Sequence, residues 1–163
     1  MPRQKEKSEG NMSLKVEDIM VRKVVTVNED YPVNDAARVM NKFEIGSLIV
    51  VSEGKAVGIV TERDFLKRVV AESKDAKKTK VKDVMTSPLV VVGPEIELEE
   101  AVKLMFQMKI KKLPVIEGER LVGLVSLTDV ARFHPQIMKV LKQYANNQAT
   151  PKSIKKVMDY YVV

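Results

Sequence analysis

Two short segments of the chain carry polar residues in the same order, at the point where an apolar, strand-like run ends. The first is GIVTERD, from Gly58 to Asp64, and the second is GLVSLTD, from Gly123 to Asp129. The hydroxyl residue in each suits the N-cap of a helix. The first turn of such a helix offers free backbone N–H groups to a phosphate, and an aspartate one turn later can accept hydrogen bonds from a ribose diol. Together these groups favour a nucleoside phosphate as the ligand.

The same segments also have a purely structural interpretation. In it, the hydroxyl residue only caps a helix and the aspartate only stabilises the first helical turn. A single copy would favour this interpretation. A second copy with the same spacing favours ligand binding, to which Arg63 and Thr128 would each add a polar contact.

Both segments belong to a longer internal repeat. Residues 16–65 and 81–130 align without a gap at a constant offset of 65 positions (81 − 16), across helix-like, strand-like and turn-like stretches. Repeated units of this kind bury surface against each other. Each copy is near the lower size limit for an independent core, so the two copies are predicted to share one core and to form paired crevices between them.

Each copy predicts the same order of elements, strand–helix–strand–strand–helix, after a short helix-prone turn. The first strand is predicted from a β-branched apolar run, and the first helix from apolar residues spaced by three and four positions. The helix-prone turns are 15–20 and 80–85, the first strands 24–27 and 89–92, and the apolar helix stripes Val33–Phe43 and Leu98–Met108.

The second half of each copy contains two strands separated by a short turn, which predicts a hairpin. A helix closes each copy, and the second closing helix is predicted to end before Pro135, because an interior proline removes a hydrogen bond. The hairpin strands are 47–52 with 56–61 and 113–117 with 121–126, and the closing helices are 62–72 and a helix from Leu127.

These elements divide an α/β (α+β) chain into five segments. The polar first segment is predicted to be disordered, and a lysine-rich linker joins the repeats. The last segment is predicted to be helical, since Thr150 and Pro151 form a typical helix start. The segments are 1–13, repeat one at 14–72, the linker at 73–80, repeat two at 81–133 and the C-terminal helical extension at 134–163.

The composition excludes several classes of site. The chain has no cysteine, and His134 is its single histidine, so neither thiolate chemistry nor a multi-histidine metal site is expected. With no nucleophile–base pair and no P-loop, we predict no catalytic residue, no metal and no enzyme activity. The first residues lack the apolar run of a signal peptide, and no run approaches the roughly 20 apolar residues of a membrane span. A cytoplasmic protein without a membrane partner is therefore expected.

The repeat resembles a tandem pair of cystathionine β-synthase (CBS) domains, also called a Bateman module. The resemblance rests on V-x-D-I/V-M at Val16–Met20 and Val81–Met85, on the Leu-Pro-Val run around Pro114, and on both glycine-to-aspartate segments. Ile49 stands in place of the proline in the first copy, a mild departure. The resemblance implies a stand-alone CBS-domain protein with pseudo-two-fold symmetry. It also implies two clefts that bind AMP, ADP, ATP or S-adenosylmethionine as a regulatory ligand, with no other cofactor.

The resemblance further implies which residues form each cleft. The polar segment of one repeat is closed by residues of the other, and Lys111 and Lys112 are expected to contact phosphates rather than to be plain surface charges. The first cleft would contain Thr61, Arg63, Asp64, Ile110, Lys111, Lys112 and backbone near Val90, and the second Ser126, Thr128, Asp129, Ile45, Gly46, Ser47 and backbone near Val25.

Two functions remain open at this point. The first is an energy-sensing regulatory module, expected as a homodimer, that transmits ligand occupancy to an unknown partner protein. The alternative is a nucleic-acid- or protein-binding adaptor that uses the basic linker and C-terminal helices, in keeping with the net charge of +6. The low aromatic content and the lack of a nucleic-acid-binding motif favour the first function.

Overall fold

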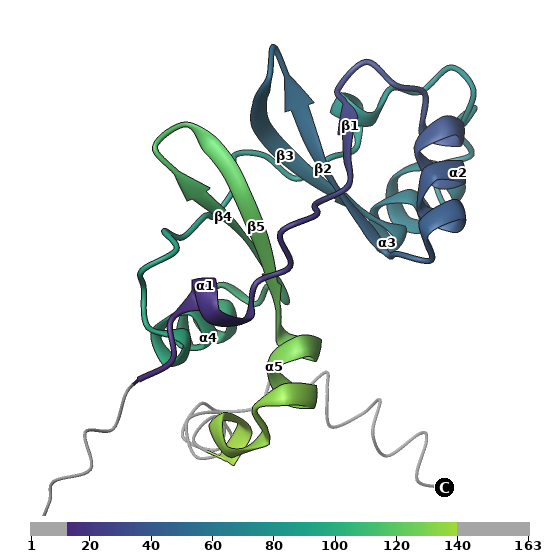
Figure 1. Ribbon diagram of the computed structural model, residues 1–163. Coiled ribbons are helices and arrows are strands. Elements are labelled where there is room, and N and C mark those ends of the chain that lie inside the picture. The colour runs from purple at the N-terminus through teal and green to yellow at the C-terminus, as the bar shows by residue number, and fades with distance from the viewer. Residues whose placement is uncertain (1–12, 140–163) are drawn as a thin grey trace, which may run out of the picture.

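The computed structural model of the chain describes residues 13–139 and contains two α/β lobes (Figure 1). The first lobe follows the predicted order of elements, and the mixed α/β fold class is confirmed. Its elements are β1 (Thr26–Asn28), α2 (Val33–Phe43), β2 (Ser47–Ser52), β3 (Lys55–Thr61), α3 (Glu62–Phe65) and the π-helical turn η1 (Leu66–Val70). The second lobe contains α4 (Leu98–Met108), β4 (Lys112–Glu117), β5 (Arg120–Ser126) and α5 (Leu127–Phe133).

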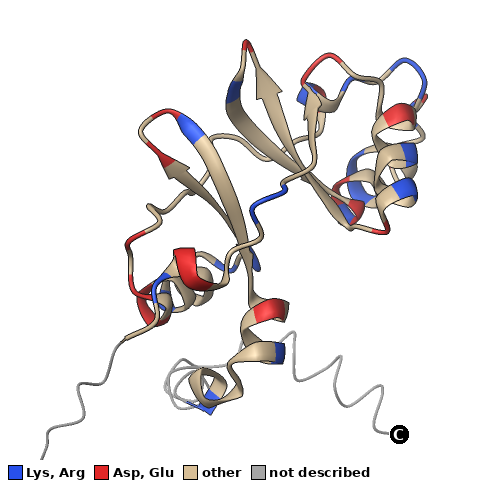
Figure 2. Cartoon of the chain, viewed as in Figure 1, with Lys and Arg blue, Asp and Glu red and all other residues tan. Residues whose placement is uncertain are grey.

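Each lobe is built on a small sheet. In the first, β1 runs parallel to β2, and β2 pairs antiparallel with β3; in the second, β4 and β5 form an antiparallel hairpin. The two hairpins have a bulge at the same position of the repeat, at Val50/Val51 and at Val115/Ile116. Charged residues lie mainly on the helices, the connecting loops and the hairpin tips, whereas the strands are largely uncharged (Figure 2). Both predicted hairpins are confirmed.

The predicted strand at 89–92 is wrong, since this segment makes only one bridge, between Val92 and Val115. In the first repeat, the N–H of Ile49 donates to the Val25 carbonyl oxygen at 3.3 Å, next to the β1 ladder. The equivalent of Ile49 in the second repeat is Pro114, which has no N–H to donate. At the other end of β1, the Glu29 N–H donates to the Val51 carbonyl oxygen at 2.9 Å, and the equivalent of Glu29 is Pro94. The two prolines therefore remove a hydrogen bond on each side of the Val92–Val115 bridge, and the second repeat has no counterpart of β1.

The helices α2 and α4 end in the same way. Each is followed by one residue in the left-handed conformation, Glu44 (φ 53°) and Lys109 (φ 54°). The next N–H then returns to the helix, from Ile45 to the Met40 carbonyl oxygen at 3.0 Å and from Ile110 to that of Met105 at 2.9 Å. Such a C-cap turns the chain sharply. It directs residues 44–47 and 109–112 toward the space between the lobes.

The first segment of each repeat packs into the lobe of the other repeat. Val16 of α1 (Val16–Ile19) and Met20 belong to the buried cluster of the second lobe, with Leu98 and Leu113. Val81 and Val84, in and just after the 3₁₀ turn η2 (Val81–Asp83), belong to the cluster of the first lobe. The prediction of one shared core is therefore wrong. There are two cores, and each contains residues of both repeats.

The packing of each repeat's first segment into the other lobe explains why a glycine opens each polar segment. A Cβ atom on Gly58 would lie 2.5 Å from the Met85 sulfur and 3.0 Å from the Thr86 carbonyl oxygen. A Cβ atom on Gly123 would likewise lie 2.5 Å from the sulfur of Met20. The methionine that ends V-x-D-I/V-M in one repeat thus packs on the glycine of the other, where no side chain fits.

The linker at 73–80 is held against the first lobe. Backbone N–H groups of Val33 and Asn34 donate to the carbonyl oxygens of Thr79 and Ala76, each at 2.9 Å. Lys80 and Lys82 form ion pairs with Asp30 at 3.2 and 2.9 Å, and these lysines hold the pKa of the exposed Asp30 carboxyl below its ordinary value. Part of the linker's positive charge is therefore already paired.

The helix α5 ends at Phe133, before Pro135, as predicted. Residues 135–139 are helical, and Ile137 and Met138 pack against the core of the second lobe. The helix predicted to start at Pro151 and the disorder predicted for the first segment (1–13) fall outside the described residues, apart from Ser13. No helix within residues 13–139 is long and apolar enough to cross a membrane.

Candidate functional site

Both polar segments start a helix, as predicted. Thr61 caps α3, and its Oγ1 accepts a hydrogen bond from the Asp64 N–H at 3.2 Å. Ser126 caps α5, and its Oγ accepts one from the Asp129 N–H at 3.1 Å. The hydroxyl residues therefore perform the structural role, and ligand binding depends on what else converges on these helix starts.

A cavity of about 470 Å³ lies beside the start of α3, and we call it the basic cleft. It brings together the six side chains expected there, from Thr61, Arg63, Asp64, Ile110, Lys111 and Lys112. The other lining residues are Gly46, Ile59, Glu62, Thr86 and Lys109. Residues of the two repeats thus meet across this cavity.

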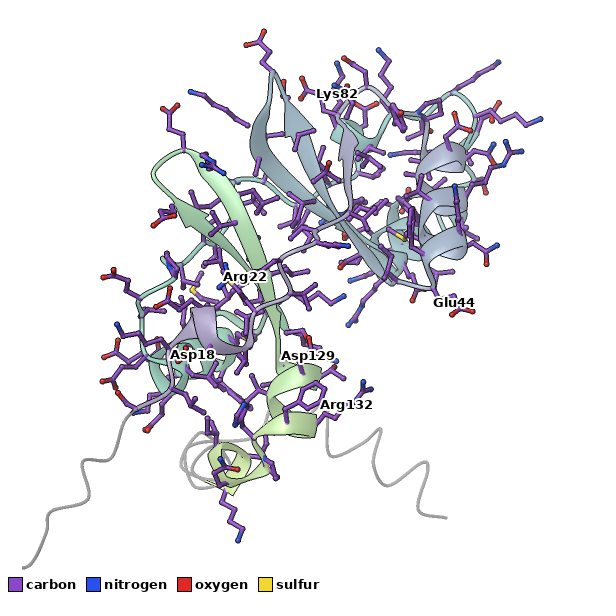
Figure 3. The ribbon with its side chains drawn as sticks, viewed as in Figure 1. Asp18, Arg22, Glu44, Lys82, Asp129 and Arg132 are labelled. Atoms are coloured by element: carbon purple, nitrogen blue, oxygen red, sulfur yellow. The ribbon has the colours of Figure 1, made fainter. Side chains whose placement is uncertain are left out.

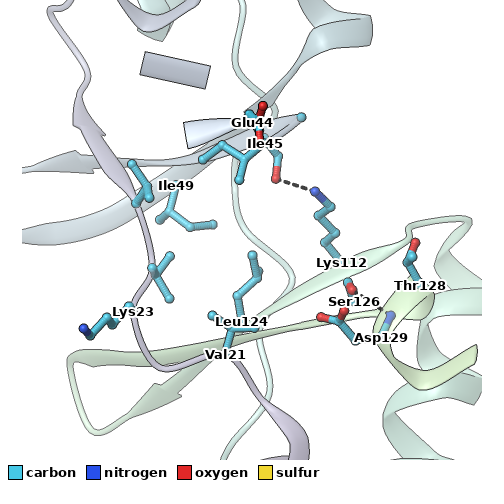
Figure 4. A pocket seen from close by; sticks show the side chains of 14 residues that line it. Val21, Lys23, Glu44, Ile45, Ile49, Lys112, Leu124, Ser126, Thr128 and Asp129 are labelled. Carbon is cyan, nitrogen blue, oxygen red and sulfur yellow. Dashed lines mark hydrogen bonds between the residues drawn. The ribbon is translucent and has the colours of Figure 1, made fainter. Parts of the chain in front are cut away.

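A second cavity of about 330 Å³ lies beside the start of α5, and we call it the second cleft (Figure 4). It brings together all seven residues expected there, Ser126, Thr128, Asp129, Ile45, Gly46, Ser47 and Val25. The remaining lining residues are Val21, Lys23, Val24, Glu44, Ile49, Lys112 and Leu124. The two clefts are related by the repeat, since each joins the polar segment of one copy to the loop of the other.

Val90 is the one expected residue that lines neither cleft. It is half-buried and packs against the core of the second lobe. Its segment is tied to β4 only at Val92, so it does not follow the path that brings Val25 to the second cleft. Thr86, four residues earlier, lines the basic cleft instead.

Lys112 lines both clefts, and its Nζ donates a hydrogen bond to Ser47 Oγ at 2.8 Å (Figure 4). Burial lowers the pKa of Lys112 below its ordinary value, while the nearby carboxylates of Glu62 and Asp129 oppose this shift. A partly desolvated ammonium between two cavities is well placed to meet an anion in either one.

The two aspartates of the repeated segment differ in their surroundings. Asp64 Oδ2 accepts hydrogen bonds from the N–H and the Oγ1 of Thr61 at 2.9 and 3.0 Å, and Arg68 lies 3.8 Å from Oδ1. Within residues 13–139, the Asp129 carboxylate has no such hydrogen bond, and Phe133 stands where the first repeat has Arg68. Asp129, at the start of α5 (Figure 3), therefore has more capacity to accept hydrogen bonds from a ligand.

Sequence reasoning missed five polar residues of the clefts. They are Lys23, Glu44, Glu62, Thr86 and Lys109. The repeat itself contained a usable signal for two of them, because Glu44 and Lys109 are equivalent positions directly before the expected loop residues. Among the described residues, no group of three or more His, Cys, Asp or Glu side chains is arranged to hold a metal ion.

Comparison with known proteins identifies the family of the chain. Residues 16–71 and 81–135 each match the family model described as CBS domain, and together they cover more than half of the 163 residues. The chain is 37% identical over 116 residues to the CBS domain-containing protein YhcV of Bacillus subtilis, which covers 71% of this chain and 82% of that protein.

Two further matches differ in extent. An inosine-5'-monophosphate dehydrogenase of Methanocaldococcus jannaschii is 37% identical over 126 residues, which cover 75% of this chain and 24% of the dehydrogenase. Among solved structures, the hexameric CBS-CP12 protein from bloom-forming cyanobacteria superimposes with a TM-score of 0.72 at 30% identity, over 93% of this chain and 84% of that chain.

Proposed function

The chain belongs to the CBS domain family, and from this premise we propose that it is a regulatory module that binds adenosine-containing ligands in its two clefts. The observation that carries the proposal is the convergence, in each cavity, of a polar segment from one repeat with a loop from the other. Their volumes of about 330 and 470 Å³ fall in the range of small-molecule sites.

The lining residues suit the three parts of a nucleotide. The carboxylates of Asp64 and Asp129 would accept hydrogen bonds from the ribose hydroxyls. Apolar side chains such as Ile45 and Ile110 would contact the base. Lys111, Lys112 and Arg63 would contact phosphate oxygens through charge-assisted hydrogen bonds. AMP, ADP, ATP and S-adenosylmethionine are the ligands to be tested.

Ligand binding would be transmitted through the contact between the repeats. A ligand in either cleft touches both repeats, so it would favour one relative arrangement of the lobes. We propose that this arrangement is detected by a separate partner protein and that the chain itself is a cytoplasmic regulator without enzyme activity.

We also propose that the chain forms a homodimer. An apolar groove of the first lobe lies between α2 and η1 and is lined by Ala37, Met40, Phe65, Leu66 and Val70, among other residues. Leu66 and Val70 are 62% and 67% exposed, and Phe43 at the end of α2 is 52% exposed. Exposed apolar side chains in and near a groove favour association.

Native mass spectrometry of the purified protein would identify any adenosine ligand that is retained. Calorimetry with adenosine, AMP, ADP, ATP and S-adenosylmethionine, and with GTP as a control for the base, would then measure affinity. Replacing both Asp64 and Asp129 by alanine should reduce binding by about ten- to a hundredfold, the loss expected for a charge-assisted hydrogen bond. Unchanged binding by the double variant would place the ligand outside these clefts.

The adaptor alternative makes a different prediction, which concerns how nucleic-acid binding depends on salt. If the basic segments bind nucleic acid, the affinity for a single-stranded oligonucleotide should fall steeply with salt. Neutralising Lys77 and Lys78 should reduce that salt dependence and leave nucleotide binding unchanged. A steep salt dependence without any adenosine-ligand binding would favour the adaptor function.

A further inference from the structure

The residues that close the two clefts differ in charge at equivalent positions of the repeat. At each of four positions, the residue that lines the basic cleft is cationic, and its counterpart in the second cleft is neutral or acidic. The pairs, basic cleft first, are Lys109 and Glu44, Lys111 and Gly46, Lys112 and Ser47, and Arg63 and Thr128. All four differences make the basic cleft more positive than the second cleft.

The basic cleft has an excess of positive charge. Arg63, Lys109, Lys111 and Lys112 line it together with two carboxylates, those of Glu62 and Asp64. One of these carboxylates is already engaged, because Asp64 Oδ2 accepts two hydrogen bonds from Thr61 and its Oδ1 lies 3.8 Å from Arg68. An anion in this cleft therefore meets mainly cations.

The second cleft has no such excess. Its cationic side chains are Lys23 and Lys112, and its anionic side chains are Glu44 and Asp129. Lys112 lines both clefts, so its charge is shared between them. Its Nζ is also hydrogen-bonded to Ser47 Oγ at 2.8 Å. Figure 3 shows Glu44 at the end of α2 and Asp129 at the start of α5, so the two carboxylates come from different lobes.

We propose that the clefts select their ligands by charge: the basic cleft takes a nucleoside di- or triphosphate, and the second cleft takes a nucleoside or a nucleoside monophosphate. This inference rests on the proposed function and adds the ligand class of each cleft. Coulomb attraction between a phosphate and several cations increases with each added phosphate charge in the basic cleft. In the second cleft, the repulsion by Glu44 and Asp129 opposes the attraction by the two lysines, so an added phosphate gains little.

The backbone offers a well-matched way to test this proposal. Glu44 and Lys109 have nearly the same left-handed conformation, with φ of 53° and 54°. The exchange Glu44→Lys with Lys109→Glu therefore places each residue type in a backbone that already holds it in the other repeat. The exchange also leaves the net charge of the protein unchanged. The matching control is the exchange Lys55→Glu with Glu119→Lys, an exposed ion pair of 3.3 Å that lines neither cleft.

The experiment measures calorimetric affinities for adenosine, AMP, ADP and ATP. Bulky, uncharged substitutions isolate each cleft without changing its charge: Thr128→Trp fills the second cleft and so reports the basic cleft, and Thr86→Trp fills the basic cleft and so reports the second cleft. In the basic cleft, affinity should rise by roughly three- to tenfold with each phosphate beyond the first, and in the second cleft it should stay level or fall. The Glu44/Lys109 exchange should reduce the rise of affinity with phosphate number in the basic cleft and give the second cleft a preference for ATP. The Lys55/Glu119 exchange should change the affinities of neither cleft.

The outcomes separate this inference from the proposed function. If no adenosine ligand binds the unmodified protein, the proposed function is wrong. If adenosine ligands bind but both clefts depend equally on phosphate number, or if the Glu44/Lys109 exchange has no more effect than its control, the proposed function stands and selection by charge is wrong.

Discussion

Ser47 and Lys112 are equivalent residues of the two repeats, and their side chains are hydrogen-bonded to each other. Lys112 Nζ donates to Ser47 Oγ at 2.8 Å, where the starts of β2 and β4 meet. Equivalent residues can touch only close to the axis that relates the repeats. Lys112 therefore lines both clefts, so its single positive charge is available to a ligand in either one.

Replacing Lys112 by methionine should weaken ATP binding by about ten- to a hundredfold, because a charge-assisted hydrogen bond to phosphate is lost. Adenosine should be affected much less, since it has no phosphate. Calorimetry on the variant measures both affinities. The control is Ser47→Ala, which removes the partner of Lys112 but leaves the ammonium in place. Equal losses for adenosine and ATP would mean that Lys112 supports the fold of the clefts rather than phosphate binding.

The lowered pKa of Lys112 predicts a dependence of stability on pH. Burial is the main cause of the lowered pKa, so the folded protein releases the Lys112 proton at a lower pH than the unfolded chain does. Between these two pKa values the unfolded state binds more protons, and the free energy of unfolding therefore rises with pH across this alkaline window. Denaturant unfolding of the unmodified protein and of Lys112→Met at several alkaline pH values tests this. The unmodified protein should gain stability relative to the variant, and a constant difference would contradict the prediction.

Gly58→Ala should destabilise the protein by about 1–3 kcal/mol, since the added methyl group overpacks the contact with Met85. Denaturant unfolding measures the change. Gly93→Ala is the matched control, because a Cβ atom there meets nothing within 4 Å, and it should leave stability within about 1 kcal/mol. Combining Gly58→Ala with Met85→Ala should cost less than the sum of the single changes, because the two residues are in contact. Strict additivity would argue against this contact.

Asp64→Ala should lower the free energy of unfolding by about 1–3 kcal/mol without ligand, because its partly buried carboxylate accepts two hydrogen bonds from Thr61. Asp129→Ala should cost less, within about 1 kcal/mol, since its carboxylate makes no equivalent bonds within the described residues. Urea unfolding of the two ligand-free variants gives the comparison. A larger loss of stability in Asp129→Ala than in Asp64→Ala would contradict this difference in hydrogen bonding between the two carboxylates.

Leu66→Lys should weaken the proposed homodimer by about tenfold or more, the effect expected when a buried leucine is removed from an interface. The fold of the single chain should be unaffected, because Leu66 is 62% exposed. Analytical ultracentrifugation over a range of concentrations measures the dissociation constant. Val91→Lys is the control, since Val91 is an exposed apolar residue that does not line the groove. A protein that is monomeric before any substitution would remove the dimer proposal.

The amino-acid sequence by itself determined the order of elements and the location of the polar segments. Helix and strand periodicities, helix caps and turns depend on neighbouring residues, so their signals are local. The constant offset of the repeat also indicated which residues would take the same conformation. Thr61 and Ser126 cap equivalent helices, and Glu44 and Lys109 have almost the same φ.

Other features were decided only by the tertiary structure, because they depend on partners distant in the sequence. The segment 89–92 reads as a strand, but one of its two missing hydrogen bonds depends on Pro114, which lies on the neighbouring strand. The hydrogen bond between Lys112 and Ser47 and the packing of Met85 on Gly58 arise from the way the repeats interlock. The contrast in charge between the clefts likewise exists only because each repeat's loop closes the cleft of the other, which brings Lys109 to one cavity and Glu44 to the other.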